Sequence, residues 1–320
     1  MTMKALYATN YSFYKENRKK PLKFVLLSDL HFSSRLKNRV TQSVVKFTTE
    51  QKPDYILFLG DIVHSLDEIQ SDESLLRLTS FFENLASIAP VIGVLGNHDF
   101  YRYDGGHDQW RITNPSRLID SLNNIDNVQF LNNSSFENDD LYIYGFSPDS
   151  EYYCYDSAHG NKSSIFNPQQ EDKNILIHNL KQIPENKLHK LSKNKSKLFL
   201  CHSPVFLGDS DTRPFVSDFD IVISGHMHNG VVPPALNDIW LSDRGIMAPG
   251  HKLFPRRTRN AIMSYKDPNI ILGAIQTIQP GLNPVGILSH AFPIFAASLT
   301  ISDNFSCKHR PRKKRQYLNS

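Results

Sequence analysis

Short runs of apolar residues recur along the chain, and each one ends in polar residues of similar chemistry. Four runs occupy residues 24–27, 55–59, 91–95 and 197–201, and a fifth spans residues 219–224. The letters that follow them are SDLH, GD, GNHD, HSP and GHMH. Continuous apolar runs of this length, bounded by glycine, proline or aspartate, are typical of strands that are buried on both faces.

Amphipathic segments separate the first of these predicted strands. Residues 36–49 and 72–88 carry apolar positions at steps of three and four, which predicts two helices. Asp72 and Glu73 suit the first turn of the second helix, where negative charge is stabilised. Strands that alternate with helices indicate an α/β fold with a largely parallel sheet. In such sheets ligands bind at the carboxyl ends of the strands, where all the polar clusters lie.

The remaining apolar runs fall within one large domain, and a short extension lies on each side of it. The runs that are predicted to complete the sheets occupy residues 128–131, 141–146, 269–274 and 297–301. We expect an N-terminal extension over residues 1–21, a single domain over residues 22–302, and a disordered basic tail over residues 303–320.

Composition indicates an ordinary globular protein. The chain has 320 residues, of which 40% are hydrophobic and 21% charged, and its formal net charge of +4 is too small to indicate a nucleic-acid partner. The N-terminus lacks the apolar core of a signal peptide, and no run approaches the ~20 apolar residues of a membrane span. Three dispersed cysteines form no disulfide framework or CxxC pair, which favours a reducing compartment.

These features lead us to expect a cytoplasmic protein without an obligate protein partner and without bound nucleic acid. The excess positive charge is concentrated in the residues after Cys307. A basic tail of this kind is a candidate for peripheral contact with an anionic membrane, although a solvated end is the commoner case.

The polar residues at the strand ends have the chemistry of metal ligands. Two carboxylates, one amide and several imidazoles combine hard oxygen with borderline nitrogen donors for divalent cations. Within two pairs the residues lie two positions apart, so an extended backbone would place both side chains on one face. The complete set is Asp29, His31, Asp61, Asn97, His98, His202, His226 and His228.

In this order the motifs D-x-H, G-D, G-N-H-D, H-x-P and G-H-x-H, between residues 29 and 228, resemble those of the calcineurin-like metallophosphoesterases, in particular a subgroup of small bacterial enzymes. The resemblance implies an α/β fold, a four-layer α/β/β/α sandwich of two mixed sheets flanked by helices. It also implies two metal ions. The ligands it implies are Asp29, His31 and His228 for the first metal, Asn97, His202 and His226 for the second, and Asp61 as the bridge.

The resemblance further implies hydrolysis of a phosphoester bond by a hydroxide that bridges the two metals. Asp61 and His98 would be the catalytic residues: His98, which is not a ligand in this scheme, would donate a proton to the leaving group. Mixed oxygen and nitrogen donors favour Mn²⁺ in our interpretation, with Fe and Zn²⁺ as alternatives.

One position departs from the pattern of the phosphoprotein phosphatases in this superfamily. Those enzymes continue G-D with x-x-D-R-G, and the second aspartate orients the catalytic histidine. Here His64 stands in its place and no arginine follows, which argues against a protein Ser/Thr phosphatase and leaves open what orients His98. His64 either contacts substrate or is a polar residue at a helix start. Arg102 and Tyr103 are further candidates for substrate contact, because loops around a metal site set specificity.

The substrate classes that remain are phosphomonoesters and phosphodiesters, with a lipid-linked diphosphate among the candidates. A nuclease or a cyclic-nucleotide phosphodiesterase is the alternative enzyme. A scaffold that has lost its metals is disfavoured, because all seven ligand positions hold residues of the expected type.

Overall fold

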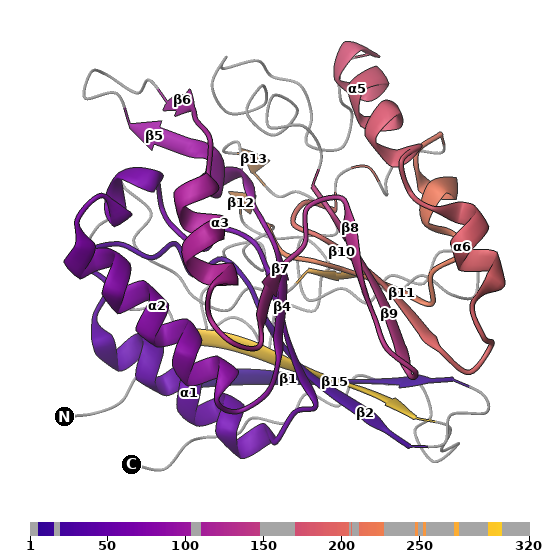
Figure 1. The fold of residues 1–320 in the computed structure, drawn as a ribbon, viewed down its shortest axis with the longest axis horizontal. Helices are drawn as coiled ribbons and strands as arrows, with labels where there is room; N and C mark the ends of the chain where they lie inside the picture. Colours follow the sequence, from indigo (N-terminus) through magenta and orange to yellow (C-terminus); the bar gives the residue numbers. More distant parts are fainter. Residues whose placement is uncertain are drawn as a thin grey trace.

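The computed structural model describes ten stretches of the chain, which are residues 6–15, 20–103, 110–147, 170–204, 206, 211–226, 247–248, 252–253, 272–274 and 294–302. Within them two β-sheets pack face to face, and helices cover the outer face of each sheet, so that the layers run helix, sheet, sheet, helix (Figure 1). The predicted four-layer α/β/β/α sandwich is confirmed.

The first sheet has six strands in the order β1-β15-β2-β3-β4-β7. Strands β2, β3, β4 and β7 run parallel, while β15 is antiparallel to β2 and parallel to β1, so the sheet is mixed. The strand bounds are Leu6–Tyr14 (β1), Leu22–Leu27 (β2), Tyr55–Leu59 (β3), Val91–Val94 (β4), Val128–Phe130 (β7) and Ile294–Ser302 (β15).

Strand β2 illustrates why these apolar runs form strands. Its alternate residues point to opposite faces: Phe24 and Leu26 enter the core between the sheets, whereas Val25 and Leu27 pack under the outer helices. All four side chains are buried, and full burial of an apolar side chain contributes about 1.5–3 kcal/mol. A continuous apolar run therefore supplies apolar side chains to the cores on both faces of the sheet, as the sequence predicts.

Three helices cover the outer face of the first sheet. They are α1 (Asn38–Gln51), α2 (Asp72–Ala86) and α3 (Ser116–Asn123), and the first two confirm the predicted amphipathic segments. Ser71 caps α2, because its hydroxyl oxygen accepts a hydrogen bond from the backbone N–H of Ser74 at 3.2 Å. The apolar stripe of α1, which includes Val44 and Phe47, packs on the sheet.

The second sheet has five strands in the order β14-β11-β10-β9-β8, all parallel except β8. The strand bounds are Ser134–Glu137 (β8), Leu141–Phe146 (β9), Ser196–Cys201 (β10), Ile221–Ser224 (β11) and Leu272–Ala274 (β14). Helices α5 (Gln170–Leu180) and α6 (Glu185–Lys190) cover its outer face over an aromatic core that includes Tyr144 and Phe199.

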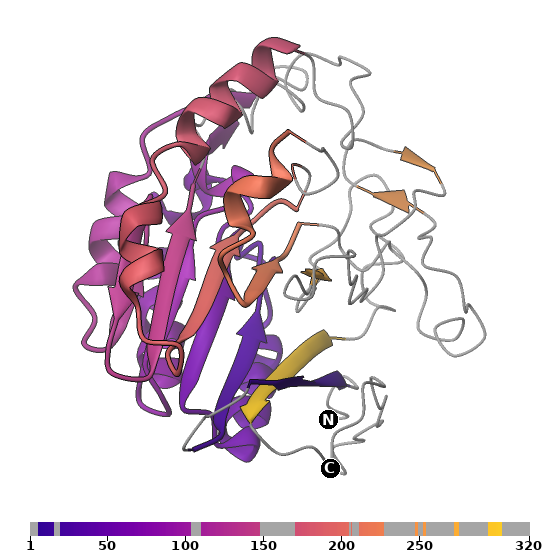
Figure 2. The ribbon, with the colours of Figure 1, turned by 90° about the vertical axis from the view of Figure 1, so that its right-hand side faces the viewer.

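The first sheet begins earlier in the chain than the sequence predicts. Residues 1–21 were expected to form an extension, but they contain β1, which pairs with β15 over nine residues at one end of the sheet (Figure 2). Aromatic and β-branched residues suit such an edge position, yet the segment lacks a continuous apolar run because few of its positions carry aliphatic side chains.

Short elements connect the layers. A hairpin of β5 (Tyr101–Tyr103) and β6 (Trp110–Ile112) follows β4, and β12 (Met247–Ala248) pairs with β13 (Lys252–Leu253). The 3₁₀ turns are η1 (Leu66–Ile69), η2 (Asn97–Phe100) and η4 (Arg213–Val216). Among the described helices, none combines the length and the apolar character needed to cross a membrane.

Candidate metal centre

The carboxyl ends of β2, β3, β4, β10 and β11 come together at one edge of the sandwich. The loops after β2 and β3 stay in register beyond the strands, since the N–H of Asp29 donates to the carbonyl of Gly60 at 2.9 Å and that of His31 donates to the carbonyl of Asp61 at 2.9 Å. After β11, the N–H of Gly225 donates to the carbonyl of His202 at 2.9 Å. These backbone bonds hold the predicted ligands from different strands beside one another.

The backbone at the ligands is left-handed and not extended, which corrects the geometry that the two-residue spacing suggested. The φ angles are 54° at Asp29, 43° at His31, 52° at Asp61 and 68° at His226. The strands end just before these residues, and the chain turns sharply where the side chains must converge. Non-glycine residues in this region cost about 1–3 kcal/mol each, and such strain clusters at functional sites.

Asp61 lies at the middle of the cluster. Its Oδ2 atom is 3.2 Å from Nε2 of His202 and 3.5 Å from Nε2 of His31, while its Oδ1 atom accepts a hydrogen bond from the N–H of His98 at 2.9 Å. Asp61 belongs to two groups in which one ligand atom from each residue lies within 4.8 Å of the others: one with His202 and His226, the other with Asp29 and His31. A carboxylate in this position can reach two cations.

His202 is oriented by the backbone of β3. Its Nδ1 atom lies 2.6 Å from the carbonyl oxygen of Leu59, and because a carbonyl can only accept, Nδ1 carries the proton. Its Nε2 atom therefore faces the cluster, 3.1 Å from Nδ1 of His226. Histidines that bind metals commonly donate their second ring N–H to a carbonyl in this way.

Charges within the cluster perturb each other. Burial alone raises the pKa of Asp61, but the surrounding imidazoles, with His202 foremost, hold that pKa well below its usual value. Burial alone lowers the pKa of His202, yet Asp61 raises it to about 9. A cation bound here would displace the Nε2 proton of His202, because metal ligation requires a neutral imidazole.

Asp29 is held by groups on both sides of the interface between the sheets. Its Oδ2 atom accepts hydrogen bonds from the hydroxyl of Ser28 at 2.5 Å and from the N–H of His226 at 3.2 Å. Ser28 is a site residue that sequence reasoning missed. The signal lies in the SDLH motif, where the serine directly precedes the ligand.

Gly96 allows the loops after β3 and β4 to approach closely. A Cβ atom at this position would lie 2.3 Å from Oδ1 of Asp61 and 2.4 Å from its backbone N. No side chain fits at those distances. The glycine that precedes the ligand is therefore required by the contact between the two loops.

Asn97 provides an observation that tests whether the residues fit a metal. Its Oδ1 atom is buried and has no hydrogen-bond partner among the residues that the structure describes. A buried amide oxygen without a partner costs about 1–3 kcal/mol, whereas a cation would satisfy it. With buried carboxylates and imidazoles beside it, the donor set fits divalent metal ions.

His98 lies in the 3₁₀ turn η2, which spans residues 97–100. The Nδ1 atom of His98 lies 2.7 Å from the backbone carbonyl of His64, which accepts its proton. The carbonyl of His64 therefore orients His98 where related phosphatases use an aspartate. The ring of His98 also contacts the ring of His31, with centroids 4.5 Å apart.

The predicted substrate contacts lie around η1, beside the cluster. His64 directly precedes Ser65, the N-cap residue of η1, and is half-buried; burial and the neighbouring His98 lower its pKa. Arg102 is exposed, and its Nε atom lies 3.9 Å from Oδ1 of Asp67 on η1. The backbone of Tyr103 ends β5, while its side chain lies outside the described part of the structure.

His228, the remaining predicted ligand, lies outside the described residues. The structure therefore brings together seven of the eight strand-end residues, namely Asp29, His31, Asp61, Asn97, His98, His202 and His226.

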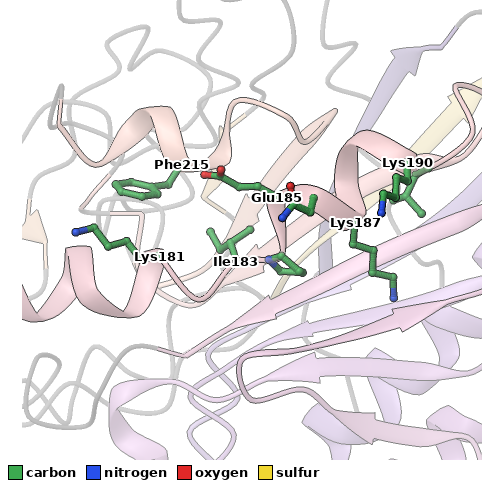
Figure 3. Close-up of a pocket in the computed structure, with 9 residues that line it drawn as sticks. Lys181, Ile183, Glu185, Lys187, Lys190 and Phe215 are labelled. Carbon is green, nitrogen blue, oxygen red and sulfur yellow. The ribbon is translucent and has the colours of Figure 1, made fainter.

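A separate hollow of about 760 Å³ lies at the helical face of the second sheet (Figure 3). It is lined by residues of α6 together with Lys181, Ile183 and Phe215, and none of its lining residues belongs to the cluster. Among the described residues, the groups of potential metal ligands lie at the strand ends and not in this hollow.

The four-layer sandwich and the cluster of carboxylate, amide and imidazole ligands at its strand ends define a metal-binding α/β protein. The sequence profile of one family, described as calcineurin-like phosphoesterase, matches residues 22–230. The chain belongs to this family, as the ordered motifs predicted.

Curated relatives include bacterial metallophosphoesterases. An uncharacterized metallophosphoesterase of Campylobacter jejuni is 24% identical over 220 residues, which cover 68% of this chain and 47% of that protein. One of Helicobacter pylori is 25% identical over 224 residues, which cover 69% and 48% of the two chains. The phosphodiesterase YaeI of Escherichia coli is 34% identical over 88 residues, which cover 28% of this chain and 31% of that protein. The chain thus spans about half the length of the first two relatives.

Solved structures that are similar to the chain include two enzymes. A phosphopantetheinyl hydrolase from Mycobacterium tuberculosis has a TM-score of 0.38 at 14% identity, covering 71% of this chain and 84% of its own. A dimetal phosphatase from Danio rerio has a TM-score of 0.40 at 14% identity, covering 80% and 87%.

Proposed function

We propose that the chain hydrolyses phosphate esters at a centre of two divalent cations. The observation that carries this proposal is the position of Asp61, whose carboxylate belongs to two separate groups of potential ligands. We assign Asp29, His31 and His228 to the first cation, Asn97, His202 and His226 to the second, and Asp61 to both.

When bound, two such cations would supply Lewis acidity for the phosphoryl oxygens and would lower the pKa of a coordinated water molecule. The side chains of this chain do the positioning. The buried carboxylates of Asp29 and Asp61 concentrate negative charge, the carbonyl of Leu59 fixes the ring of His202, and Ser28 fixes Asp29. The metal-binding atoms are thus held in place before a cation arrives.

His98 protonates the leaving group in this proposal. Because Nδ1 of His98 donates to the carbonyl of His64, the proton that can be transferred is on Nε2 of the imidazolium. That proton moves to the ester oxygen as the bond from phosphorus to oxygen breaks, and the imidazole is left neutral. The hydrogen bond from the N–H of His98 to Asp61 keeps the donor beside the bridging carboxylate.

The donor set favours Mn²⁺ in our proposal. The site combines two carboxylates and an amide with imidazoles, and oxygen-rich sites suit Mn²⁺ better than sites made of nitrogen and sulfur alone. The described part of the cluster contains no cysteine ligand. Iron and Zn²⁺ are the competing metals, so the protein should be assayed with each of them.

To identify the substrate class, the protein should be assayed with a phosphomonoester, a phosphodiester and a nucleoside-diphosphate lipid. The name of the relative YaeI, a phosphodiesterase, supports the diester arm. Hydrolysis of bis-p-nitrophenyl phosphate without hydrolysis of p-nitrophenyl phosphate would identify a diesterase, and cleavage of single-stranded DNA or a cyclic nucleotide would favour the alternative enzyme.

The variants Asp61→Asn and His98→Ala test the residue assignments. Asp61→Asn should lower the rate by at least about 100-fold with Mn²⁺ and weaken metal binding, since electrostatic stabilisation is the largest contribution to such reactions. The exposed Asp120→Asn and His178→Ala are matched controls that should retain activity. Full activity of Asp61→Asn would refute the bridging role.

The role of His98 as proton donor has a sharper test. His98→Ala should lower kcat by about 10²–10⁴-fold for an alkyl phosphate, whose leaving oxygen needs a proton. The loss should be much smaller for p-nitrophenyl phosphate, whose leaving group is stable as an anion. Equal losses on both substrates would contradict proton donation and leave His98 with a role in binding.

We propose that the basic tail after Cys307, which lies outside the described residues, brings the protein to an anionic membrane. The full chain and a chain that ends at residue 307 can be sedimented with phosphatidylserine vesicles. Equal binding of the two would contradict this proposal without affecting the assignment of the metal ligands.

A further inference from the structure

Three imidazoles meet at the edge of the proposed two-metal site. His31, His64 and His98 come from the loops after β2, β3 and β4, and one potential ligand nitrogen from each lies within 4.8 Å of the others. Their ring centroids are 4.5 Å apart for His31 and His98, 5.4 Å for His64 and His98, and 6.0 Å for His31 and His64. The proposed function leaves His64 without a ligand role.

Hydrogen bonds connect the loops that carry the three rings. The N–H of His64 donates to the carbonyl of Phe32 at 3.0 Å, and the N–H of Phe32 donates to the carbonyl of Ile62 at 2.8 Å, so the chain at His64 is tied to the chain after His31. The carbonyl of His64 in turn accepts the Nδ1 proton of His98 at 2.7 Å. Each ring is therefore tied, directly or through one residue, to the loop of another.

The three ligand nitrogens lie close enough for small movements to bring them onto one metal ion. With metal to nitrogen bonds of about 2.0–2.1 Å, neighbouring ligand nitrogens in a zinc site are about 3.3–3.5 Å apart. A closure of roughly 1.5 Å from the 4.8 Å limit is within the reach of small ring rotations. His64 and His98 are half-buried, which leaves this side of the cluster accessible to an ion.

The chemistry of three imidazoles selects a different cation from the rest of the centre. Zn²⁺ is bound well by imidazole nitrogens, as in catalytic sites with three histidines and one open position, whereas Mn²⁺ prefers oxygen ligands. The three ligands of this group are all imidazoles, so the group favours Zn²⁺ over Mn²⁺, although Oδ2 of Asp61 lies 3.5 Å from Nε2 of His31.

We propose that His31, His64 and His98 form a Zn²⁺ position whose occupation inhibits the enzyme. This inference rests on the proposed function. Zn²⁺ at this position withdraws His31 from the first cation and occupies Nε2 of His98, which then has no proton to give to the leaving group. Excess Zn²⁺ thus inhibits the Mn²⁺-loaded protein through His64, the residue that replaces the aspartate of related phosphatases.

Two measurements on the full chain test the inference. Zn²⁺ is titrated into the Mn²⁺-loaded protein, and the rate of each variant is compared with its own rate in Mn²⁺ alone. Loss of an outer-shell partner of a metal already costs about 10–100-fold in affinity, so His64→Ala should need at least about tenfold more Zn²⁺ for half-inhibition. The exposed His178→Ala should behave like wild type.

The second measurement does not depend on activity. Crystals of the protein grown with Mn²⁺ and soaked in Zn²⁺ are measured on both sides of the zinc absorption edge. We expect an anomalous zinc peak between the rings of His31, His64 and His98. His64→Gln, which retains a polar side chain of similar size, should lose that peak, and its thermal unfolding shows whether it remains folded.

The outcomes separate this inference from the proposed function. Equal Zn²⁺ sensitivity of wild type and His64→Ala, or a zinc peak at Asp61 alone, overturns the inference while hydrolysis with Mn²⁺ supports the function. If no phosphoester is hydrolysed with any metal, the proposed function fails, and the inhibitory role falls with it. The diffraction measurement still decides whether the three histidines bind Zn²⁺.

Discussion

Asp99 and Ile62 are joined by a hydrogen bond that connects two loops of the metal centre. Oδ1 of Asp99 accepts a hydrogen bond from the N–H of Ile62 at 2.8 Å and a second from Val63 at 3.0 Å, while Oδ2 accepts one from Gly96 at 2.8 Å. Asp99 is fully buried. A single carboxylate therefore fixes the loop that carries Asp61 against the loop that carries Asn97 and His98.

Replacing this carboxylate should loosen both loops. In Asp99→Asn one of the two acceptor oxygens becomes an amide donor, which leaves at least one buried backbone N–H unsatisfied. We expect a loss of about 1–3 kcal/mol in the free energy of unfolding, measured by urea denaturation, together with lower activity. The same substitution at exposed Asp120 on α3 is the control. Wild-type stability of Asp99→Asn would show that the hydrogen bonds contribute nothing.

Gly96→Ala should move Asp61. The added Cβ would lie 2.4 Å from the backbone N of Asp61, so the two loops would have to separate. Overpacking of this kind costs about 1–3 kcal/mol. We expect weaker metal binding by isothermal titration calorimetry and lower stability together. Unchanged metal affinity with reduced stability would indicate that the loops separate without displacing the ligands.

Metal removal should destabilise the protein. The carboxylates of Asp29 and Asp61 are buried beside imidazoles. A bound cation would neutralise the carboxylates and accept the imidazoles as ligands, so it should bind the folded state in preference to the unfolded chain. At a free Mn²⁺ concentration of about 100 times Kd, the gain is about 2.7 kcal/mol per site. Thermal unfolding in EDTA and in Mn²⁺ measures it. Asp61→Asn should show a smaller difference, and identical Tm values for wild type in the two conditions would argue against metal binding.

The ion pairs of Glu137 give a pH dependence far from the metal centre. Its carboxylate accepts hydrogen bonds from Lys187 at 2.8 Å and from Lys195 at 2.6 Å, and these lower the pKa of Glu137 in the folded protein. Because the pKa of Glu137 is lower in the folded protein, the ion pairs stabilise the fold at pH values above 4.5, the ordinary pKa of glutamate. This contribution disappears as the pH falls through the pKa of Glu137 in the folded protein.

Glu137→Gln should therefore lower stability at pH 7 and leave it unchanged at acidic pH, below the folded pKa. Solvent screening limits the difference at pH 7 to less than about 1 kcal/mol. Urea unfolding at the two pH values measures it, with the exposed Glu50→Gln as the control. A difference that persists at low pH would mean that packing, and not charge, is responsible.

Much of the fold could be predicted from local patterns. The apolar runs of β2, β3, β4, β10 and β11 and the stripes of α1 and α2 are confirmed, because buried strands and amphipathic helices require these periodicities wherever they occur. Strand β1 could not be found this way. Its pairing partner is β15, near the other end of the chain, and a partner so distant leaves no local signal.

By itself, the sequence determined the family, the four-layer class of fold and the types of residue at the strand ends, because these depend on residue identity and order along the chain. The tertiary structure decided how the side chains converge. The left-handed turns at Asp29, His31 and Asp61 exist because neighbouring loops hydrogen-bond across the strand ends. The tertiary structure also decided that the backbone carbonyl of His64 accepts the Nδ1 proton of His98, in place of a carboxylate. Every residue type has a carbonyl, so only the fold determines which one lies beside His98.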